Sequence, residues 1–101
     1  MEIIEASMKS SICFGVFIRE QQIAFARVVT DYATLYYVAD VIVDEAYRGI
    51  GAAKRMMDSI VNYPDISRLR GMLITKDAEG LYEKSGFKRY EITFMEKIGE
   101  A

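Results

Sequence analysis

The segment formed by residues 41–53 constrains the fold of this chain more than any other. An apolar run, Val41-Ile42-Val43, leads into Arg48-Gly49-Ile50-Gly51-Ala52-Ala53, and helical periodicity follows. This order predicts a buried strand, a turn with two glycines, and a helix that opens at the turn. Because the first N–H groups of a helix lack partners and the helix dipole favours negative charge there, the turn could hold a phosphate. Glycines that merely supply the backbone angles of a strand-to-helix turn explain the same pattern.

The composition limits the chemistry that the chain can carry. Its 101 residues predict one domain, residues 1–101, and a net charge of −2 gives no reason to expect binding to nucleic acid or to a membrane surface. The chain has no histidine, which excludes Ser–His and Cys–His nucleophiles and histidine metal sites, so no metal is expected. Cys13 is the single cysteine, so no intrachain disulfide can form. Since no signal peptide or membrane span is recognisable, a cytoplasmic location is expected.

The pattern of apolar residues predicts the secondary structure. Ile3, Ile4 and Met8 recur at helical spacing, so residues 1–10 are predicted to form a short helix or the end of one. The other predicted elements are strands at 11–19, 23–30 and 35–43, a helix at 47–63 with Ile50 on its inner side, a strand at 71–75, a helix from Asp77 to Gly86, and one or two closing strands within 87–98.

These elements predict an α/β (α+β) fold built on a mixed, mostly antiparallel sheet with helices on both faces. Hairpins make the first three strands antiparallel, and the helix at 47–63 makes the third and fourth strands parallel through a right-handed crossover. The natural cleft of such a sheet lies between the third and fourth strands, beside the glycine turn.

Two motifs resemble the GNAT superfamily of acetyl-CoA-dependent N-acyltransferases. Residues 48–53 match the family's Arg/Gln-x-x-Gly-x-Gly/Ala motif after a strand, and Ala78–Phe87 looks like its A-x-x-L-Y-x-K-x-G-F signature. Residues 25–34, with Ala39-Asp40-Val41, are similar to a subgroup of small bacterial acetyltransferases. The resemblance extends over roughly residues 3–98 and implies transfer of an acetyl group from acetyl-CoA to a primary amine, by direct attack in a ternary complex.

The resemblance also implies which residues bind the cofactor. The turn would hold the pyrophosphate, and the backbone of Val41, Ile42 and Val43 would pair with pantetheine. Thr75 stands where the family often has asparagine, so one cofactor contact is expected to be weaker. The complete expected set is Val41, Ile42, Val43, Arg48, Gly49, Ile50, Gly51, Ala52, Ala53, Lys54, Thr75, Ala78, Leu81 and Lys84.

Tyr82 is the expected general acid. In the family, a tyrosine at this place protonates the departing thiolate, and a phenol with a pKa near 10 is protonated at neutral pH. The structural alternative is a core aromatic residue on the inner face of a helix.

The general base is less defined by the sequence. Asp40 is the one acid in the third predicted strand, where burial would raise its pKa, and strict alternation places it on the same face as Val38 and Ile42. A structural carboxylate is the alternative for Asp40, Asp31 and Tyr32 are rivals, and ordered water could replace a base. The acceptor pocket is predicted to contain Asp31, Tyr32, Tyr36 and Tyr37.

The N-terminus departs from the family pattern, which begins with a strand and two helices before the hairpin. Only ten residues precede Ser11, so the first strand and first helix are expected to be missing, together with a wall of the acceptor site. The strand at 11–19 would then have a bare edge, which predicts a homodimer. A truncated, non-catalytic acyl-CoA-binding module is the alternative function. A nucleotide-phosphate binder is a more remote one, because the turn lacks the spacing and Lys-Ser/Thr of a P-loop.

Overall fold

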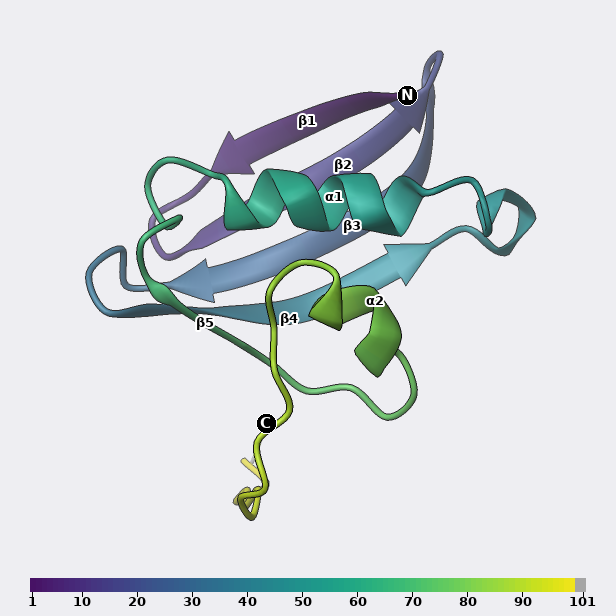
Figure 1. The fold of residues 1–101 in the computed structure, drawn as a ribbon. Helices are drawn as coiled ribbons and strands as arrows, with labels where there is room; N and C mark the ends of the chain where they lie inside the picture. The colour runs from purple at the N-terminus through teal and green to yellow at the C-terminus, as the bar shows by residue number, and fades with distance from the viewer. Residues whose placement is uncertain (100–101) are drawn as a thin grey trace.

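The computed structural model describes residues 1–99 and has a five-stranded sheet with two helices packed on it (Figure 1). The strands lie in the order β1-β2-β3-β4-β5; β1 to β4 pair antiparallel, and β4 pairs parallel with β5. The predicted mixed, mostly antiparallel sheet is therefore confirmed. The strands are β1 (Glu2–Ser7), β2 (Ser11–Ile18), β3 (Gln21–Thr30), β4 (Leu35–Val43) and β5 (Arg70–Leu73), and the helices are the 3-10 helix η1 (Glu45–Tyr47), α1 (Ala52–Val61) and α2 (Glu79–Glu83).

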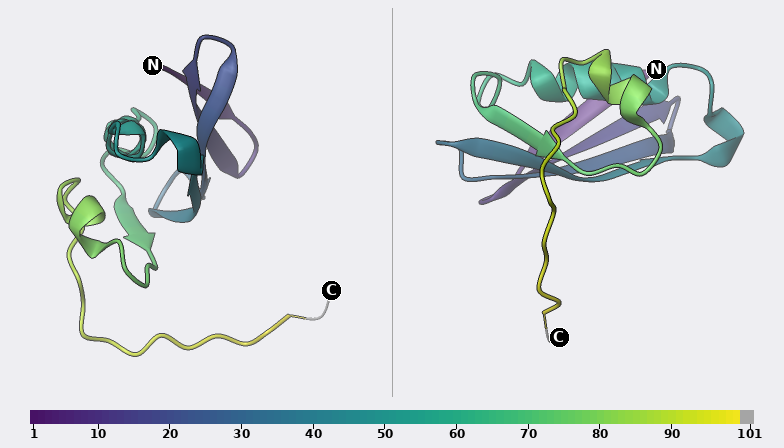
Figure 2. Two further views of the ribbon diagram at one scale, coloured as in Figure 1. Left: turned by 90° about the vertical axis from the view of Figure 1, so that its right-hand side faces the viewer. Right: turned by 60° about the horizontal axis from the view of Figure 1, so that its bottom comes forward.

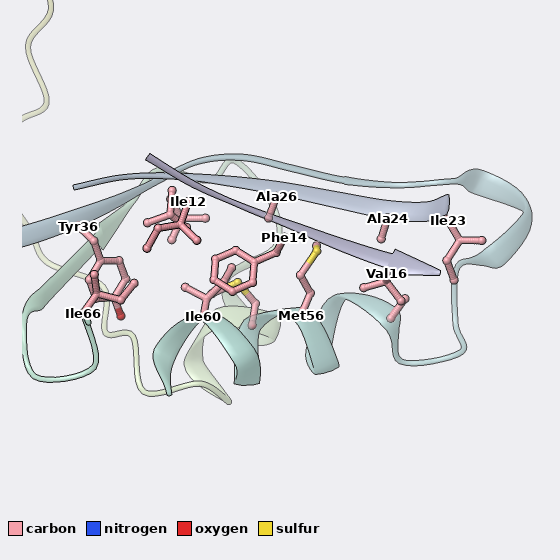
Figure 3. Packing of buried hydrophobic residues seen from close by; sticks show 14 residues of the cluster. Ile12, Phe14, Val16, Ile23, Ala24, Ala26, Tyr36, Met56, Ile60 and Ile66 are labelled. Atoms are coloured by element: carbon pink, nitrogen blue, oxygen red, sulfur yellow. The ribbon is translucent and has the colours of Figure 1, made fainter. Parts of the chain in front are cut away.

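The core lies between α1 and the inner face of β2, β3 and β4 (Figure 3). Alternate residues of β2, namely Ile12, Phe14 and Val16, are completely buried beneath Met56 and Ile60 of α1. Burial of each large side chain stabilises the fold by about 1.5–3 kcal/mol relative to exposure. The inward-facing residues of the strands and the inner side of α1 thus form one core layer.

The helix after the glycine turn begins later than residue 47, the predicted start. Residues Glu45–Tyr47 form η1, and α1 opens only at Ala52. Gly49 and Gly51 adopt φ angles of 86° and 83°, which interrupt any continuous helix from 47 onward. In consequence Ile50, predicted on the inner side, is 47% exposed.

Both helices cover the same face of the sheet, whereas helices on both faces were predicted. The crossover from β4 to β5 places α1 on this face, and α2 packs beside α1 (Figure 2). No helix among residues 1–99 covers the opposite face of β2, β3 and β4. We call that opposite side the open face.

Residues 1–10 were predicted as helix, and this prediction is wrong. Glu2–Ser7 form β1, which pairs antiparallel with β2 from Glu2↔Phe17 to Ser7↔Ile12. A tight turn closed by the hydrogen bond from Met8 N to Ser11 O, at 2.8 Å, makes the hairpin possible. Two adjacent isoleucines fit a helix and a strand equally well, so only tertiary pairing decides between them. The expectation that β2 has a bare edge is therefore also wrong.

The closing strands predicted within residues 87–98 are not formed. Gly86 ends the turn after α2 at a φ of 96°, as predicted for a helix stop, and Phe87 packs back onto the core. Residues 88–99 then run away from the sheet with exposed side chains (Figure 2). A strand needs a hydrogen-bonded neighbour, and no part of residues 1–86 supplies one to this segment.

Candidate cofactor and active site

The glycine turn leaves a row of backbone donors unused. Asp44 caps η1 by accepting from Ala46 N at 2.9 Å, and the first hydrogen bond of α1 runs from Arg55 N to Gly51 O at 3.0 Å. Between these points, no hydrogen bond within the described chain engages the N–H groups of residues 49–54. They lie at the N-terminus of α1, where the helix dipole also attracts negative charge. Such an arrangement is suited to an anion.

Backbone conformation, and not crowding, explains the two glycines. A Cβ atom at Gly49 or Gly51 would meet nothing within 4 Å, but both residues have left-handed φ angles that other residues rarely adopt. Residues with left-handed φ angles are also found in the backbone nests that hold phosphates. The space beside them is open.

The sheet splits next to this turn. β4 and β5 pair only from Leu35↔Arg70 to Val38↔Leu73, while β4 continues to Val43 with β3 on its other side. The backbone of residues 39–43 therefore has a free edge that faces the gap beyond β5. This edge can pair with an extended ligand that carries amide groups. Val41, Ile42 and Val43 lie along it, as predicted, with Val41 and Val43 packed toward the core and Ile42 on the open face.

Tyr82 lies on the helix-covered face, on α2. The hydroxyl of Thr75 accepts from Ala78 N at 3.1 Å and so fixes the start of α2. The Tyr82 ring meets Phe87 edge-on with centroids 6.4 Å apart, and burial raises the pKa of its hydroxyl. Tyr82 therefore carries its proton at neutral pH. Leu81 is half-buried beside it, and Lys84 is exposed.

Asp40 does not occupy the position that alternation predicted. A β-bulge lies between the pairs Arg27↔Asp40 and Val28↔Val38, so Ala39 is an extra residue in β4. The bulge turns Asp40 to the open face, together with Ile42 but opposite to Val38. Asp40 is also not buried: its side chain is 45% exposed and its Oδ2 lies 2.9 Å from Nε of Arg27. The structural interpretation, a carboxylate held by a partner, describes this geometry, although the partner is an arginine and not the backbone.

Asp31 and Tyr32 lie far from the glycine turn. They form the hairpin at the other end of β4, roughly 25 Å away by the rise of a nine-residue strand. Asp31 accepts hydrogen bonds from the Thr34 hydroxyl and from the N–H groups of Thr34 and Ala33, and these bonds lower its pKa. The Tyr32 hydroxyl donates to Met8 O at 3.0 Å. The structure does not bring either residue to the predicted site.

Tyr36 and Tyr37 point to opposite faces of β4. Tyr36 is 5% exposed and belongs to the core, where burial raises its pKa; Tyr37 is half-buried on the open face, opposite Val29. Tyr36 lies against Gly71 so closely that a Cβ there would be 2.5 Å from its ring. The sequence does not predict this contact. A glycine in a strand can allow a neighbouring side chain to approach the backbone, but the neighbour, here Tyr36, is known only from the structure.

The open face carries a hollow near the C-terminal end of β4. It has a volume of about 470 Å³ and is lined by Gln22, Ile23, Ala24, Phe25, Ile42 and Asp44. Sequence reasoning missed its members from β3, since the register that brings Phe25 beside Ile42 is a tertiary feature.

Residues 1–99 contain no cluster of three or more acidic, cysteine or histidine side chains that could hold a metal ion. In the same residues, no helix has the length and apolar character needed to cross a membrane.

Comparison with known proteins agrees with this geometry. A family model described as the acetyltransferase (GNAT) domain matches residues 9–89. A GNAT-family protein from Xanthomonas campestris is 43% identical, with a TM-score of 0.80, and the match covers 89% of this chain and 66% of that protein. A GNAT-family acetyltransferase from Streptococcus pneumoniae is 22% identical over 92% of this chain and 74% of its own length, with a TM-score of 0.78. No curated protein sequence matched.

A third similar structure was solved together with acetyl-CoA. It is a predicted acetyltransferase from Clostridium acetobutylicum solved with acetyl-CoA, 19% identical with a TM-score of 0.70 over 86% of this chain and 64% of its own. The chain thus spans about two thirds of the Xanthomonas and Clostridium proteins. The glycine turn, the split beside β4 and the match over residues 9–89 lead to one conclusion: this chain belongs to the GNAT acetyltransferase family.

Proposed function

We propose that this protein transfers the acetyl group of acetyl-CoA to a primary amine by direct attack in a ternary complex. One observation carries the proposal: the unused N–H groups of residues 49–54 follow the end of β4, and the edge of β4 beyond Val38 is not paired with β5. The Clostridium structure supports acetyl-CoA as the donor, because a protein of this fold was solved with it.

The turn would bind the pyrophosphate, and the strand would bind pantetheine. Six consecutive donors at residues 49–54 suit two linked phosphates, and Arg48 is exposed beside them. Lys54 pairs with Asp58, so its charge is partly neutralised by that partner. The backbone of Val41–Val43 would add an extended ligand to the sheet, with Thr75, Ala78, Leu81 and Lys84 on the side of α2.

In the transfer step, Tyr82 would supply the proton that the leaving group needs. The amine nitrogen forms a bond to the thioester carbonyl carbon, the carbon–sulfur bond breaks, and the sulfur takes both electrons of that bond. Tyr82 gives its hydroxyl proton to this thiolate and recovers a proton from the solvent or from the nitrogen, which becomes positively charged when the neutral amine attacks. The raised pKa of Tyr82 keeps the proton available throughout the neutral range.

The acceptor would approach from the open face. The helices cover the opposite face, and the hollow beside Phe25, Ile42 and Asp44 is open to solvent. Asp40 faces this side, so it is a candidate base, but its bond to Arg27 must be exchanged before it can take a proton from the amine. Ordered water is the alternative base.

The open face, from which the acceptor would approach, is not covered by a helix of the described chain, and this favours a second function. Asp31 and Tyr32 lie at the other end of β4, and the described chain places no helix over the open face. A module that binds acyl-CoA without turnover would need only the complete half of the site. In either function, a cytoplasmic location is part of the proposal and is consistent with the free thiol of Cys13.

Thiol release from acetyl-CoA, measured over a panel of primary amines, tests the proposal. We expect turnover with at least one amine class, and we expect Tyr82→Phe to lower kcat by 10²–10⁴-fold, the usual contribution of general acid catalysis, while calorimetric affinity for CoA is retained. Tyr63→Phe is the matched control, because Tyr63 packs on Phe14 at the far end of α1. CoA binding without turnover by any amine would favour the second function, and absence of CoA binding would exclude both.

A further inference from the structure

An ion pair lies on the open face among apolar side chains. Arg27 of β3 and Asp40 of β4 are direct cross-strand partners, and Nε of Arg27 lies 2.9 Å from Oδ2 of Asp40. The neighbouring positions on this face, in both directions along the two strands, are occupied by Phe25, Val29, Tyr37 and Ile42. The bulge at Ala39 turns Asp40 to this face, and bulges are common next to active sites. Because a half-exposed ion pair contributes little to stability, folding alone does not account for this one.

The pair keeps most of its hydrogen-bonding capacity. A guanidinium has N–H donors on all three nitrogens, and within residues 1–99 only the donor on Nε of Arg27 is used. The fork formed by the two terminal nitrogens can therefore bind a second carboxylate in bidentate geometry. Oδ1 of Asp40 makes no hydrogen bond with the described residues, so it can accept one from an amine. The two side chains are 47% and 45% exposed, so a ligand can reach both from solvent.

The ion pair lies beside both the cofactor edge and the hollow of the open face. Asp40 belongs to residues 39–43, whose backbone edge is not paired with β5 and would bind pantetheine. Phe25 and Ile42 are each two residues from a member of the pair, and both line the hollow of about 470 Å³. Two residues of a strand span about 7 Å, a distance that an aromatic or long aliphatic side chain can bridge.

We propose, on the basis of the proposed acetyltransferase function, that the acceptor is an α-amino acid with an apolar side chain. Its carboxylate binds the terminal nitrogens of Arg27 and draws Arg27 away from Asp40. Asp40 then accepts a hydrogen bond from the amino group, and takes its proton when the nitrogen bonds to the thioester carbon. The apolar side chain of the acceptor lies in the hollow against Phe25 and Ile42. An amine without a carboxylate leaves the ion pair intact, so Asp40 stays occupied by Arg27.

Turnover of matched substrates tests this inference. We expect kcat/KM to be at least tenfold higher for phenylalanine than for phenethylamine, which is the same amine without the carboxylate. Leucine and 3-methylbutylamine form a second pair of this kind. Arg27→Gln should lower kcat/KM for the amino acids at least tenfold, while kcat/KM for the carboxylate-free amines stays equal or rises, because Asp40 is no longer held. Arg68→Gln removes a positive charge from an exposed position before β5 and is the matched control, which should change neither value.

The outcomes separate this inference from the proposed function. Equal kcat/KM for the amino acids and the carboxylate-free amines would overturn the inference and leave the acetyltransferase activity standing. An equal loss for both classes in Arg27→Gln would do the same, since it would indicate a structural role of Arg27; circular dichroism checks that the variant is folded.

Binding provides a second test that needs no turnover. In calorimetry with saturating CoA, Arg27→Gln should raise the Kd of phenylalanine and of leucine at least tenfold. A wild-type chain that binds CoA but neither amino acid would overturn the inference.

Discussion

The two ends of β4 are built on opposite principles. At the N-terminal end, the hairpin of residues 31–34 closes on itself: Asp31 accepts from Ala33 and Thr34, and the Thr30 hydroxyl donates to Leu35 O at 2.7 Å. At the C-terminal end, the N–H groups of residues 49–54 have no partner in the described chain, and β4 outruns β5. Both ends contain polar residues that looked functional in the sequence.

The difference shows how to tell a structural turn from a binding turn. Polar groups that satisfy each other stabilise the fold and leave nothing for a ligand. Backbone N–H groups that have no hydrogen-bond partner in the protein can donate to a ligand. By this criterion the C-terminal end is the site, and the N-terminal end serves the fold.

The largest expected effect concerns the paired, N-terminal half of β4. Gly71→Ala should lower the free energy of unfolding by about 1–3 kcal/mol, because its Cβ would lie 2.5 Å from the ring of buried Tyr36, which cannot easily move. Urea denaturation measures the loss. Tyr36→Leu in the same chain should recover part of it. An unchanged midpoint for Gly71→Ala would show that the two strands are less tightly packed here than the structure indicates.

The next effect concerns the open, C-terminal end. Gly51→Val should weaken acetyl-CoA binding roughly tenfold or more, about 1.4 kcal/mol, because a β-branched residue at φ 83° strains the turn and redirects its N–H groups. Isothermal calorimetry measures this affinity. Gly80→Ala is the control, since Gly80 has no positive φ and no neighbour within 4 Å. Equal affinity for wild type and Gly51→Val would remove the turn from the binding site.

A smaller effect should depend on pH. Hydrogen bonds from Thr34 lower the pKa of Asp31 in the folded state, so its stabilisation is present above the unfolded pKa of about 4 and is lost as the pH falls toward the folded pKa. Asp31→Asn should therefore be less stable than wild type at pH 7, and the difference should shrink in acid. Thermal melts between pH 7 and pH 3 measure it. Acetyl-CoA affinity should not change, and a clear loss would mean that the two ends are coupled.

The smallest effect on stability is expected for the ion pair on the open face. Arg27→Ala should lower the free energy of unfolding by less than about 1 kcal/mol, because both side chains are nearly half exposed and solvent screens the pair.

The turnover rate tests a catalytic role of Asp40 more directly than stability does. If Asp40 is the base, Asp40→Asn should reduce kcat with little change in stability, whereas equal kcat would leave the role to water.

Local sequence patterns predicted much of the fold. The apolar residues of 35–43 predicted β4 with the bounds that the structure shows. The candidate cofactor site was predictable for the same reason, because a strand, two glycines and a helix are contiguous in the chain. Such signals need no information about distant residues.

Other features were decided only by tertiary structure. Residues 1–10 became a strand because β2 offered hydrogen bonds to them, whereas residues 88–99 run away from the sheet and form no strand. The bulge at Ala39 reversed the side of Asp40, since a single extra residue changes the parity of a strand. The sequence by itself determined the turn and the order of elements through neighbouring residues. The face to which each strand residue points, and the neighbour with which each strand pairs, were set by contacts between segments far apart in the chain. The free energy of a strand depends on which segment its edge pairs with, and the local sequence does not contain that information.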